Sequence, residues 1–219
     1  MLALIVGVVY FGAQNATFLF VSQVVADPRI EQSFGLLVSL ATIVAASLGV
    51  GLTVFFAALR KDFPLKAYLA FHRPATEQLR VWAAYLVLFM LALHAVAYVL
   101  GRPFVTEFEA QLYKTAQNIP LLLLTVVAAA PIFEELFVRG FIYQGLASSR
   151  IGPTGAIIVT AALWSSIHVQ YDPIEMGMIF AGGLLLGYAR LRSDSIFIPI
   201  GMHALWNLTS SVETMLLLD

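Results

Sequence analysis

The strongest constraint on this chain is a series of long apolar runs that contain few charged side chains. Seven such runs occupy roughly residues 2–25, 34–59, 81–100, 120–147, 154–170, 174–190 and 195–217. A helix needs about 20 apolar residues to cross the hydrocarbon core of a bilayer, and the runs are close to that length. The pattern therefore predicts an all-α, polytopic membrane helix bundle of about seven transmembrane helices.

Composition narrows the classes of function. The chain has 219 residues, of which 60% are hydrophobic and only 11% are charged, whereas a soluble domain carries about 25% charged residues. The net charge of −1 provides no basic surface for nucleic acid. The chain has no cysteine, which excludes disulfides, thiolate metal ligands and a cysteine nucleophile. We expect residues 1–219 to form a single membrane domain whose partner is the lipid bilayer and not nucleic acid.

Two segments of the first half need separate interpretation. The first run has no basic residues before it and contains Gln14 and Asn15, which predicts a retained helix and not a cleaved signal peptide. The segment 61–80 is the only sizeable polar stretch, and it mixes basic with apolar residues. Such a mixture is compatible with a short helix lying in the membrane interface and equally with a plain loop.

The distribution of lysine and arginine predicts the orientation in the membrane. With seven spans, the N-terminus shares a side with the connections after the second, fourth and sixth spans. That side holds eight basic residues, which are Arg60, Lys61, Lys66, Arg73, Arg80, Arg150, Arg190 and Arg192. The other side holds three, which are Arg29, Arg102 and Lys114. Because cytoplasmic loops are enriched in Lys and Arg, we expect a multi-pass protein of the cell membrane with a cytoplasmic N-terminus and a C-terminus on the opposite side.

Three charged residues lie well inside the fourth run. Glu135 and Arg139 are four residues apart and can form an ion pair on one helix face. Glu134 is rotated from Glu135 by about 100° and has no local partner, so it must face a polar cavity, be protonated or meet a group on another helix. Pro131 lacks an N–H group and predicts a bend just before the glutamates. The alternative is a purely structural pair of glutamates that Arg139 neutralises.

Polar groups on three predicted helices have similar depths in the membrane. His168 lies near the end of the fifth run, while His203 and Asn207 lie one turn apart in the seventh. At about 1.5 Å of rise per residue, these groups and Glu134 lie roughly 12–20 Å from the cytoplasmic ends of their helices. The shared depth predicts one polar cavity. His94 has no polar companion on its own helix, and we interpret it as a packing or helix-to-helix hydrogen-bond residue.

This set of side chains is suited to hydrolysis by an activated water molecule. A carboxylate can take a proton from water, imidazole and amide groups can donate to an oxyanion, and imidazole can also bind a metal. Motifs of other intramembrane proteases are missing, because the chain has no H-E-x-x-H, no G-x-S-G and no aspartate within a span. Ser165 is one turn from His168 on the same helix, which is poor geometry for a nucleophile, and we interpret it as a packing residue.

Three short motifs follow one another in order, namely Glu134-Glu135-x-x-x-Arg139, Trp164-x-x-x-His168 and His203-x-x-x-Asn207. They resemble the E-E-x-x-x-R, F-x-x-x-H and H-x-x-x-N motifs of the CPBP (CAAX protease and bacteriocin-processing, or Abi) family of intramembrane proteases, which is related to the type II CAAX prenyl endopeptidases. The resemblance implies that residues 118–217 form the catalytic core and residues 1–117 form peripheral helices and the interfacial segment. Trp164 stands where the family usually has Phe, a change that we expect to affect the shape of the substrate pocket and not the chemistry.

The resemblance implies an intramembrane endopeptidase that cleaves a membrane-associated peptide or lipidated protein. Glu134 would activate the attacking water with the help of His168, while His203 and Asn207 would hold the oxyanion. The residues implied to support the site are Glu135, Arg139 and Trp164.

Whether a metal takes part is a separate question. His168, His203 and Glu134 could hold a divalent ion such as zinc with one open position. Asn207 is a poor zinc ligand, and Glu134 must stay free if it is the base. These considerations favour a glutamate-activated water without obligatory zinc.

Two other classes of function are compatible with the same residues. A proton-coupled or metal-ion transporter could use the Glu and His cluster as a relay, and a non-catalytic membrane scaffold could keep the fold. Transporters commonly show repeats and broken helices in both halves. Here the polar groups lie in the second half alone, which favours the enzyme.

The predicted orientation can be tested by site-directed labelling. Cysteines introduced at Lys66 and at Asp219 should react with impermeant thiol reagents from opposite sides of the membrane, because an odd number of spans separates them. The chain has no native cysteine that could interfere. Labelling of both positions from the same side would contradict the seven-span topology.

Overall fold

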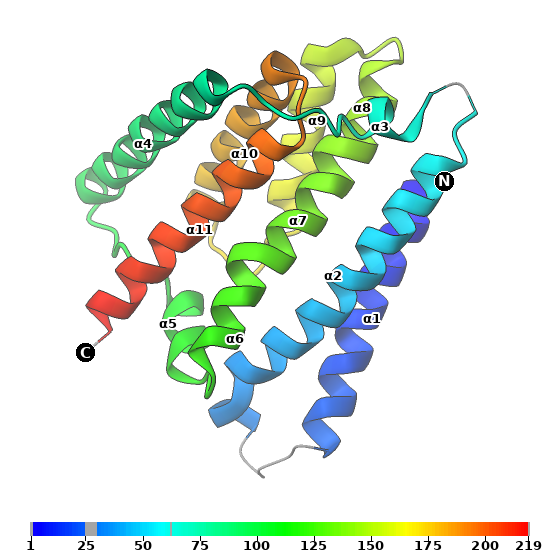
Figure 1. The fold of residues 1–219 in the computed structure, drawn as a ribbon. Coiled ribbons are helices and arrows are strands. Elements are labelled where there is room, and N and C mark those ends of the chain that lie inside the picture. Colours follow the sequence, from blue (N-terminus) through cyan, green and yellow to red (C-terminus); the bar gives the residue numbers. More distant parts are fainter. Residues whose placement is uncertain (1, 25–29, 62, 219) are drawn as a thin grey trace.

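The computed structural model describes residues 2–24, 30–61 and 63–218, and these residues form a helical bundle (Figure 1). The predicted all-α class is confirmed. The long single helices are α1 (Leu2–Val24), α2 (Phe34–Ala58), α4 (Thr76–Val99), α9 (Gly152–Ser166), α10 (Pro173–Ser193) and α11 (Phe197–Leu217). Shorter elements are η1 (Ile30–Ser33), α3 (Leu65–Tyr68) and α5 (Glu107–Lys114). Arg29 and Asp219, which entered the topology argument, lie outside the described residues.

Five helical segments are long and apolar enough to cross a membrane. They are Leu2–Gln23, Phe34–Ala58, Thr76–Val99, Ile119–Ala147 and Pro173–Ser193. Helix α9 has 15 residues and is about 22 Å long, which is shorter than the ~30 Å hydrocarbon core. Helix α11 has 21 residues but is less apolar than these five, since it carries His203, Asn207 and Glu213. The count of seven spans therefore stays a prediction.

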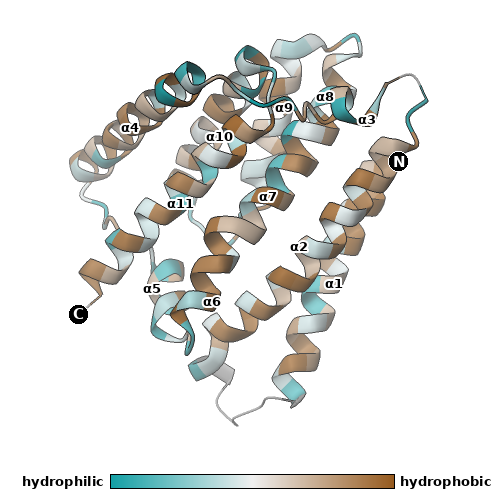
Figure 2. Cartoon of the chain, in the orientation of Figure 1, coloured by the Kyte–Doolittle hydropathy of each residue, from teal (hydrophilic) through white to brown (hydrophobic). Residues whose placement is uncertain are grey.

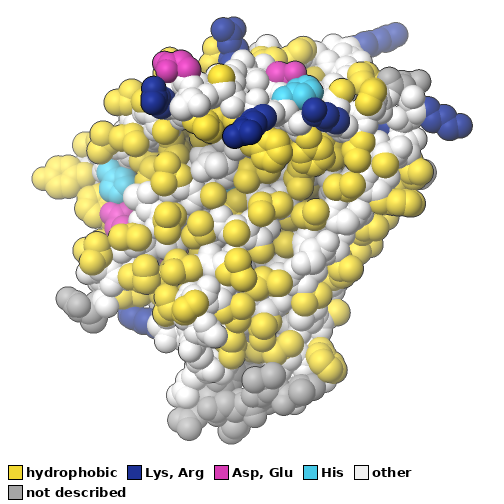
Figure 3. All heavy atoms as spheres, viewed as in Figure 1, with side chains coloured by type: hydrophobic (Ala, Val, Ile, Leu, Met, Phe, Trp, Pro, Cys, Tyr) yellow, Lys and Arg dark blue, Asp and Glu magenta, His cyan; other side chains and the backbone are white. Residues whose placement is uncertain are grey.

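The direction of the helices agrees with an odd number of passes through the bundle. Helix α1 begins and α11 ends at opposite ends of the molecule, and successive long helices alternate in direction (Figure 1). Hydrophobic residues occur along much of the long helices (Figure 2). Most of the visible Lys and Arg side chains gather at the end that carries α3 and the α8–α9 connection (Figure 3). Which end faces the cytoplasm stays a prediction.

The fourth predicted span is a composite central helix. Its parts are α6 (Ile119–Leu123), η2 (Leu124–Ala129), α7 (Ala130–Glu135), η3 (Leu136–Ile142) and α8 (Tyr143–Ala147). The two η segments are wide, π-type turns, in which an N–H group bonds to the carbonyl five residues earlier and not four. Such wide turns often occur at functional sites, and here they flank the two glutamates.

Pro131 explains how the first wide turn is completed. The N–H of Ala130 bonds to the carbonyl of Thr125. The next carbonyl in this register, that of Val126, would need an N–H from Pro131, which has none. Nδ2 of Asn207 donates to this carbonyl instead, at 2.7 Å. Where the sequence predicts a bend at Pro131, the structure has a wide turn, and α11 supplies the missing donor.

The polar segment 61–80 differs from the interfacial helix that was one of its two interpretations. It contains a single helical turn, α3, and helix α4 begins at Thr76, five residues earlier than predicted. Leu69 and Ala70 are fully buried, and the Ala70 carbonyl accepts a hydrogen bond from the Ile196 N–H at 3.0 Å. Leu69 and Ala70 therefore pack inside the bundle, whereas Phe63 and Leu79 of the same segment are exposed.

Close packing of α9 on α10 depends on small residues. A Cβ atom added at Gly183 would lie 2.9 Å from the Cβ of Ala161, and one added at Gly187 would lie 3.0 Å from the side chain of Ile157. The two glycines are one turn apart and let the helix backbones approach each other, as small residues do in membrane helices. This approach brings α9 and α10 within reach of the central helix.

Candidate active site

One large cavity, of about 990 Å³, lies within the bundle. Its wall combines residues of α1, α2, α4, α5, the central helix, α9, α10 and α11. The candidate residues that line it are Glu134, Trp164, His168, His203 and Asn207. The structure thus brings together, on one cavity, side chains that the sequence separates by up to 73 positions.

Beside the cavity, Arg139 and Glu135 form a buried ion pair. Both side chains have no exposed surface, and Nη1 of Arg139 donates to Oε1 of Glu135 at 2.8 Å. Nη2 of Arg139 reaches the Gly183 carbonyl at 3.4 Å. The guanidinium carbon lies 4.5 Å from the centroid of the Trp164 ring, in a cation–π contact. The predicted pair is present, and groups from α9 and α10 also contact the cation, while Nε of Arg139 is buried without a hydrogen-bond partner.

His203 belongs to the same network. Its Nδ1 lies 2.9 Å from Oε1 of Glu135, the oxygen that also accepts from Arg139. A carboxylate paired with Arg139 only accepts hydrogen bonds, so Nδ1 of His203 is the donor. The other ring nitrogen, Nε2, is left for the cavity. It can donate to an oxyanion only when the imidazole carries protons on both nitrogens.

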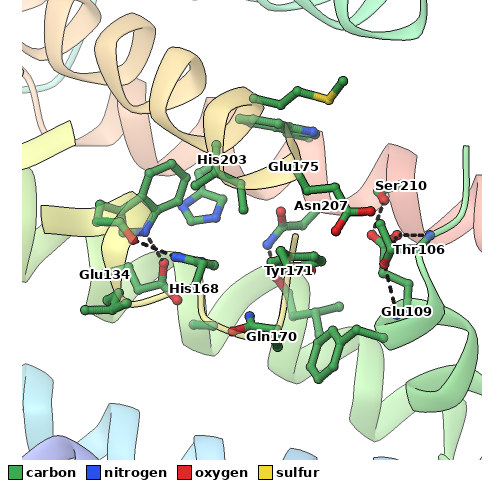
Figure 4. Close-up of a pocket in the computed structure, with 18 of the residues that line it drawn as sticks. Thr106, Glu109, Glu134, His168, Gln170, Tyr171, Glu175, His203, Asn207 and Ser210 are labelled. Atoms are coloured by element: carbon green, nitrogen blue, oxygen red, sulfur yellow. Dashed lines mark hydrogen bonds between the residues drawn. The ribbon is translucent and has the colours of Figure 1, made fainter. Parts of the chain in front are cut away.

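Glu134 has different surroundings from its neighbour Glu135. Its Oε2 accepts a hydrogen bond of 2.6 Å from the indole Nε1 of Trp164. The side chain is partly exposed to the cavity, where Figure 4 shows it near His168 and His203. The sequence left three possibilities for Glu134, which were a polar cavity, protonation or a partner on another helix. In the structure its side chain faces the cavity and also contacts Trp164 on another helix.

His168 lies outside the helix in which it was predicted. Helix α9 ends at Ser166, and His168 occupies the turn before α10, which begins at Pro173 with Asp172 as its N-cap. The Nδ1 atom of His168 lies 2.6 Å from the Trp164 carbonyl and must donate to it. In a neutral ring the lone pair is then on Nε2. The ring also stacks on Tyr171, with centroids 6.1 Å apart.

Ser165 and His94, which the sequence predicts to be packing or hydrogen-bond residues, both make contacts between helices. The Oγ of Ser165 donates to the Met176 carbonyl at 2.6 Å, which joins α9 to α10 as expected of a packing residue. His94 is a helix-to-helix hydrogen-bond residue, since its Nε2 lies 3.0 Å from the Glu213 carboxylate on α11.

The other end of the cavity holds a polar group that was not predicted. Glu109 accepts from the N–H and the Oγ1 of Thr106 at 3.1 and 3.0 Å, and its second oxygen accepts from Ser210 at 2.6 Å. Figure 4 shows these residues apart from Glu134 and His168. The spacing Thr106-x-x-Glu109 is a capping-box pattern that is visible in the sequence. The contact with Ser210 has no local signal.

The candidate metal ligands are His168, His203 and Glu134. Among the described residues, no group of three or more His, Asp or Glu side chains could hold a metal ion. Nδ1 of His168 is engaged by a carbonyl, and Nδ1 of His203 by Glu135. These contacts do not involve the Nε2 atom of either ring, so catalysis without an obligatory zinc stays a prediction.

Because only Glu135 belongs to the buried network, substitutions of the two glutamates should affect stability unequally. Glu135→Gln should lower the free energy of unfolding by about 3–5 kcal/mol, because it leaves the Arg139 charge buried and uncompensated. Glu134→Gln should change stability much less, since Gln can still accept from Trp164. Thermal unfolding of the purified variants in detergent measures both. Equal losses of stability would contradict the structural role of Glu135.

Comparison with known proteins supports the resemblance. Residues 116–209 match the model of the type II CAAX prenyl endopeptidase Rce1-like family. An uncharacterized 24.3 kDa protein of Escherichia coli is 30% identical over 141 residues, which cover 59% of this chain and 64% of that protein. The uncharacterized protein YyaK of Bacillus subtilis (strain 168) is 27% identical over 108 residues, covering 47% of this chain and 35% of that protein.

These matches span less than two thirds of the length of the two curated relatives. No solved structure matches the chain. The segment matched by the family model begins before the central helix and ends within α11. It therefore contains the two glutamates, Arg139, both cavity histidines and Asn207. The match of residues 116–209 to the Rce1-like model supports a relation of this chain to the CAAX protease family.

Proposed function

We propose that this protein is an intramembrane endopeptidase that hydrolyses a peptide bond of a membrane-associated substrate with water activated by Glu134. The proposal rests on the different surroundings of the two adjacent glutamates. Glu135 is committed to Arg139 and His203, whereas Glu134 faces a large cavity beside His168. The relation to CAAX proteases supports peptide hydrolysis as the chemistry.

Glu134 serves as the general base in the proposed reaction. One of its oxygens accepts from Trp164, and the other takes a proton from water as the water attacks the scissile carbonyl carbon. The neutral ring of His168 presents a lone pair on Nε2 that accepts from the same water and orients it. When the C–N bond breaks, protonated Glu134 returns the proton to the leaving nitrogen, which gives a carboxylic acid and an amine; transfer of the acid proton to the amine then gives a carboxylate and an ammonium group.

His203 and Asn207 stabilise the oxyanion that forms during the attack. His203 donates from Nε2 while Nδ1 is held by Glu135, which requires the imidazolium form and explains the use of a carboxylate as its partner. One N–H of the Asn207 amide is engaged by the Val126 carbonyl, and the second is available. Donors held in this way need no rearrangement during the reaction.

The cavity wall supports a substrate that arrives from the membrane. Leu4, Val8 and Phe11 of α1, Leu163 of α9 and Ile167 just after α9 line the cavity and are also exposed. An apolar surface that continues from the lipid-facing exterior into the cavity suits a membrane-associated peptide or a lipidated protein. We place the protein in the cell membrane, with the basic end of the bundle in the cytoplasm.

The proposal predicts that Glu134→Gln abolishes cleavage. The loss of a general base typically lowers the rate by about 10²–10⁴-fold, and the amide cannot accept the proton. Comparative proteomics of membrane peptides from cells with wild-type or Glu134→Gln protein identifies a substrate, and purified protein in liposomes then measures its cleavage rate. The matched control is Glu77→Gln, because Glu77 is an exposed glutamate outside the cavity lining. Cleavage by Glu134→Gln at the wild-type rate would refute the proposal.

A further inference from the structure

Trp164 contacts Glu134 and three further groups of the candidate site, which are His168, Arg139 and His203. Its indole N–H donates to Glu134 at 2.6 Å, and its carbonyl accepts from His168 at 2.6 Å. The guanidinium of Arg139 lies over its ring, and the ring of His203 lies edge-on, with centroids 5.2 Å apart. The side chain is 3% exposed, so the packing around it leaves the indole little freedom to move.

The hydrogen bond from the indole acts on the orientation of the Glu134 carboxylate. Tryptophan Nε1 is a donor only, and a short bond from N–H to an ionised carboxylate is stronger than a bond between neutral groups. It engages Oε2 and leaves Oε1 as the oxygen for the cavity. Phenylalanine at position 164 would keep an aromatic ring next to Arg139 and His203, but it would offer no donor to Glu134.

The geometry points to Trp164 as a positioning residue for the proposed hydrolysis: its indole N–H holds Glu134 so that the free carboxylate oxygen faces the reacting water. This inference rests on the proposed function, because it needs Glu134 to be the base. The presence of Trp in place of Phe in this motif would then affect the proposed base Glu134 directly, in addition to the shape of the pocket.

Trp164→Phe tests the inference in the enzyme. We expect kcat to fall about 10- to 100-fold, in line with the loss of a hydrogen bond to a charged group, and KM to stay unchanged because the N–H does not touch substrate. The matched control is Trp82→Phe, which removes an indole from the same buried cluster without touching Glu134 and should leave kcat unchanged. A variant with benzothienylalanine at position 164 keeps the shape of the ring system, lacks the N–H and should behave as Trp164→Phe does.

A spectroscopic measurement tests the hydrogen bond without any substrate. The chain has three tryptophans, and ¹⁵N labelling gives each indole N–H its own NMR signal. We expect the Trp164 proton to lie downfield in the wild type and to move upfield in Glu134→Gln, while the signals of Trp82 and Trp206 stay in place. This readout uses the native Trp164 and is available even if Trp164→Phe fails to fold.

The outcomes separate the inference from the proposed function. The positioning role would be overturned if the chemical shift of the Trp164 indole proton were the same in Glu134→Gln as in the wild type, or if Trp164→Phe had an unchanged kcat. The proposed function would stand in both cases. Cleavage by Glu134→Gln at the wild-type rate would overturn both, whatever the indole signal shows. A moved signal together with a lower kcat and an unchanged KM would support the inference.

Discussion

The burial of Arg139 is the constraint on which the rest of the site depends. Removing a guanidinium from water costs several kcal/mol unless its charge and its N–H groups find partners. Glu135 supplies the opposite charge, the Gly183 carbonyl on α10 accepts a second hydrogen bond, and the Trp164 ring on α9 covers the cation. His203 on α11 binds the same oxygen of Glu135. The buried ion pair thus links the central helix with α9, α10 and α11.

This network also explains how two adjacent glutamates acquire different properties. A step of one residue turns the side chain by about 100°, so Glu135 faces Arg139 while Glu134 faces the cavity. The wide turns on either side reshape the helix at this point. In the first of them Pro131 leaves the Val126 carbonyl free, and Asn207 binds it. Helix α11 is therefore anchored twice to the central helix, through His203 and through Asn207.

The parts of the fold that follow local rules could be predicted from the sequence. The apolar runs predicted the helices, and the four-residue spacing predicted the pair of Glu135 with Arg139. The contacts of Trp164 with Glu134 and of Asn207 with Val126 could not be predicted, because they join residues 30 and 81 positions apart and depend on how the helices pack. The prediction that His168 lies within a helix was wrong for a local reason, because capping of α10 by Asp172 requires a turn where the apolar run continues.

A pair of double-mutant cycles tests most directly whether Glu135 is coupled energetically to Arg139 while Glu134 is not. The free energy of unfolding is measured for Glu135→Gln, Arg139→Met and the double variant, and in parallel for the cycle of Glu134→Gln with Arg139→Met. We predict a coupling energy of about 1–3 kcal/mol between Glu135 and Arg139, as found for residues in one buried network, and a much smaller one between Glu134 and Arg139. Equal couplings, or a larger one for Glu134, would contradict this account of the site.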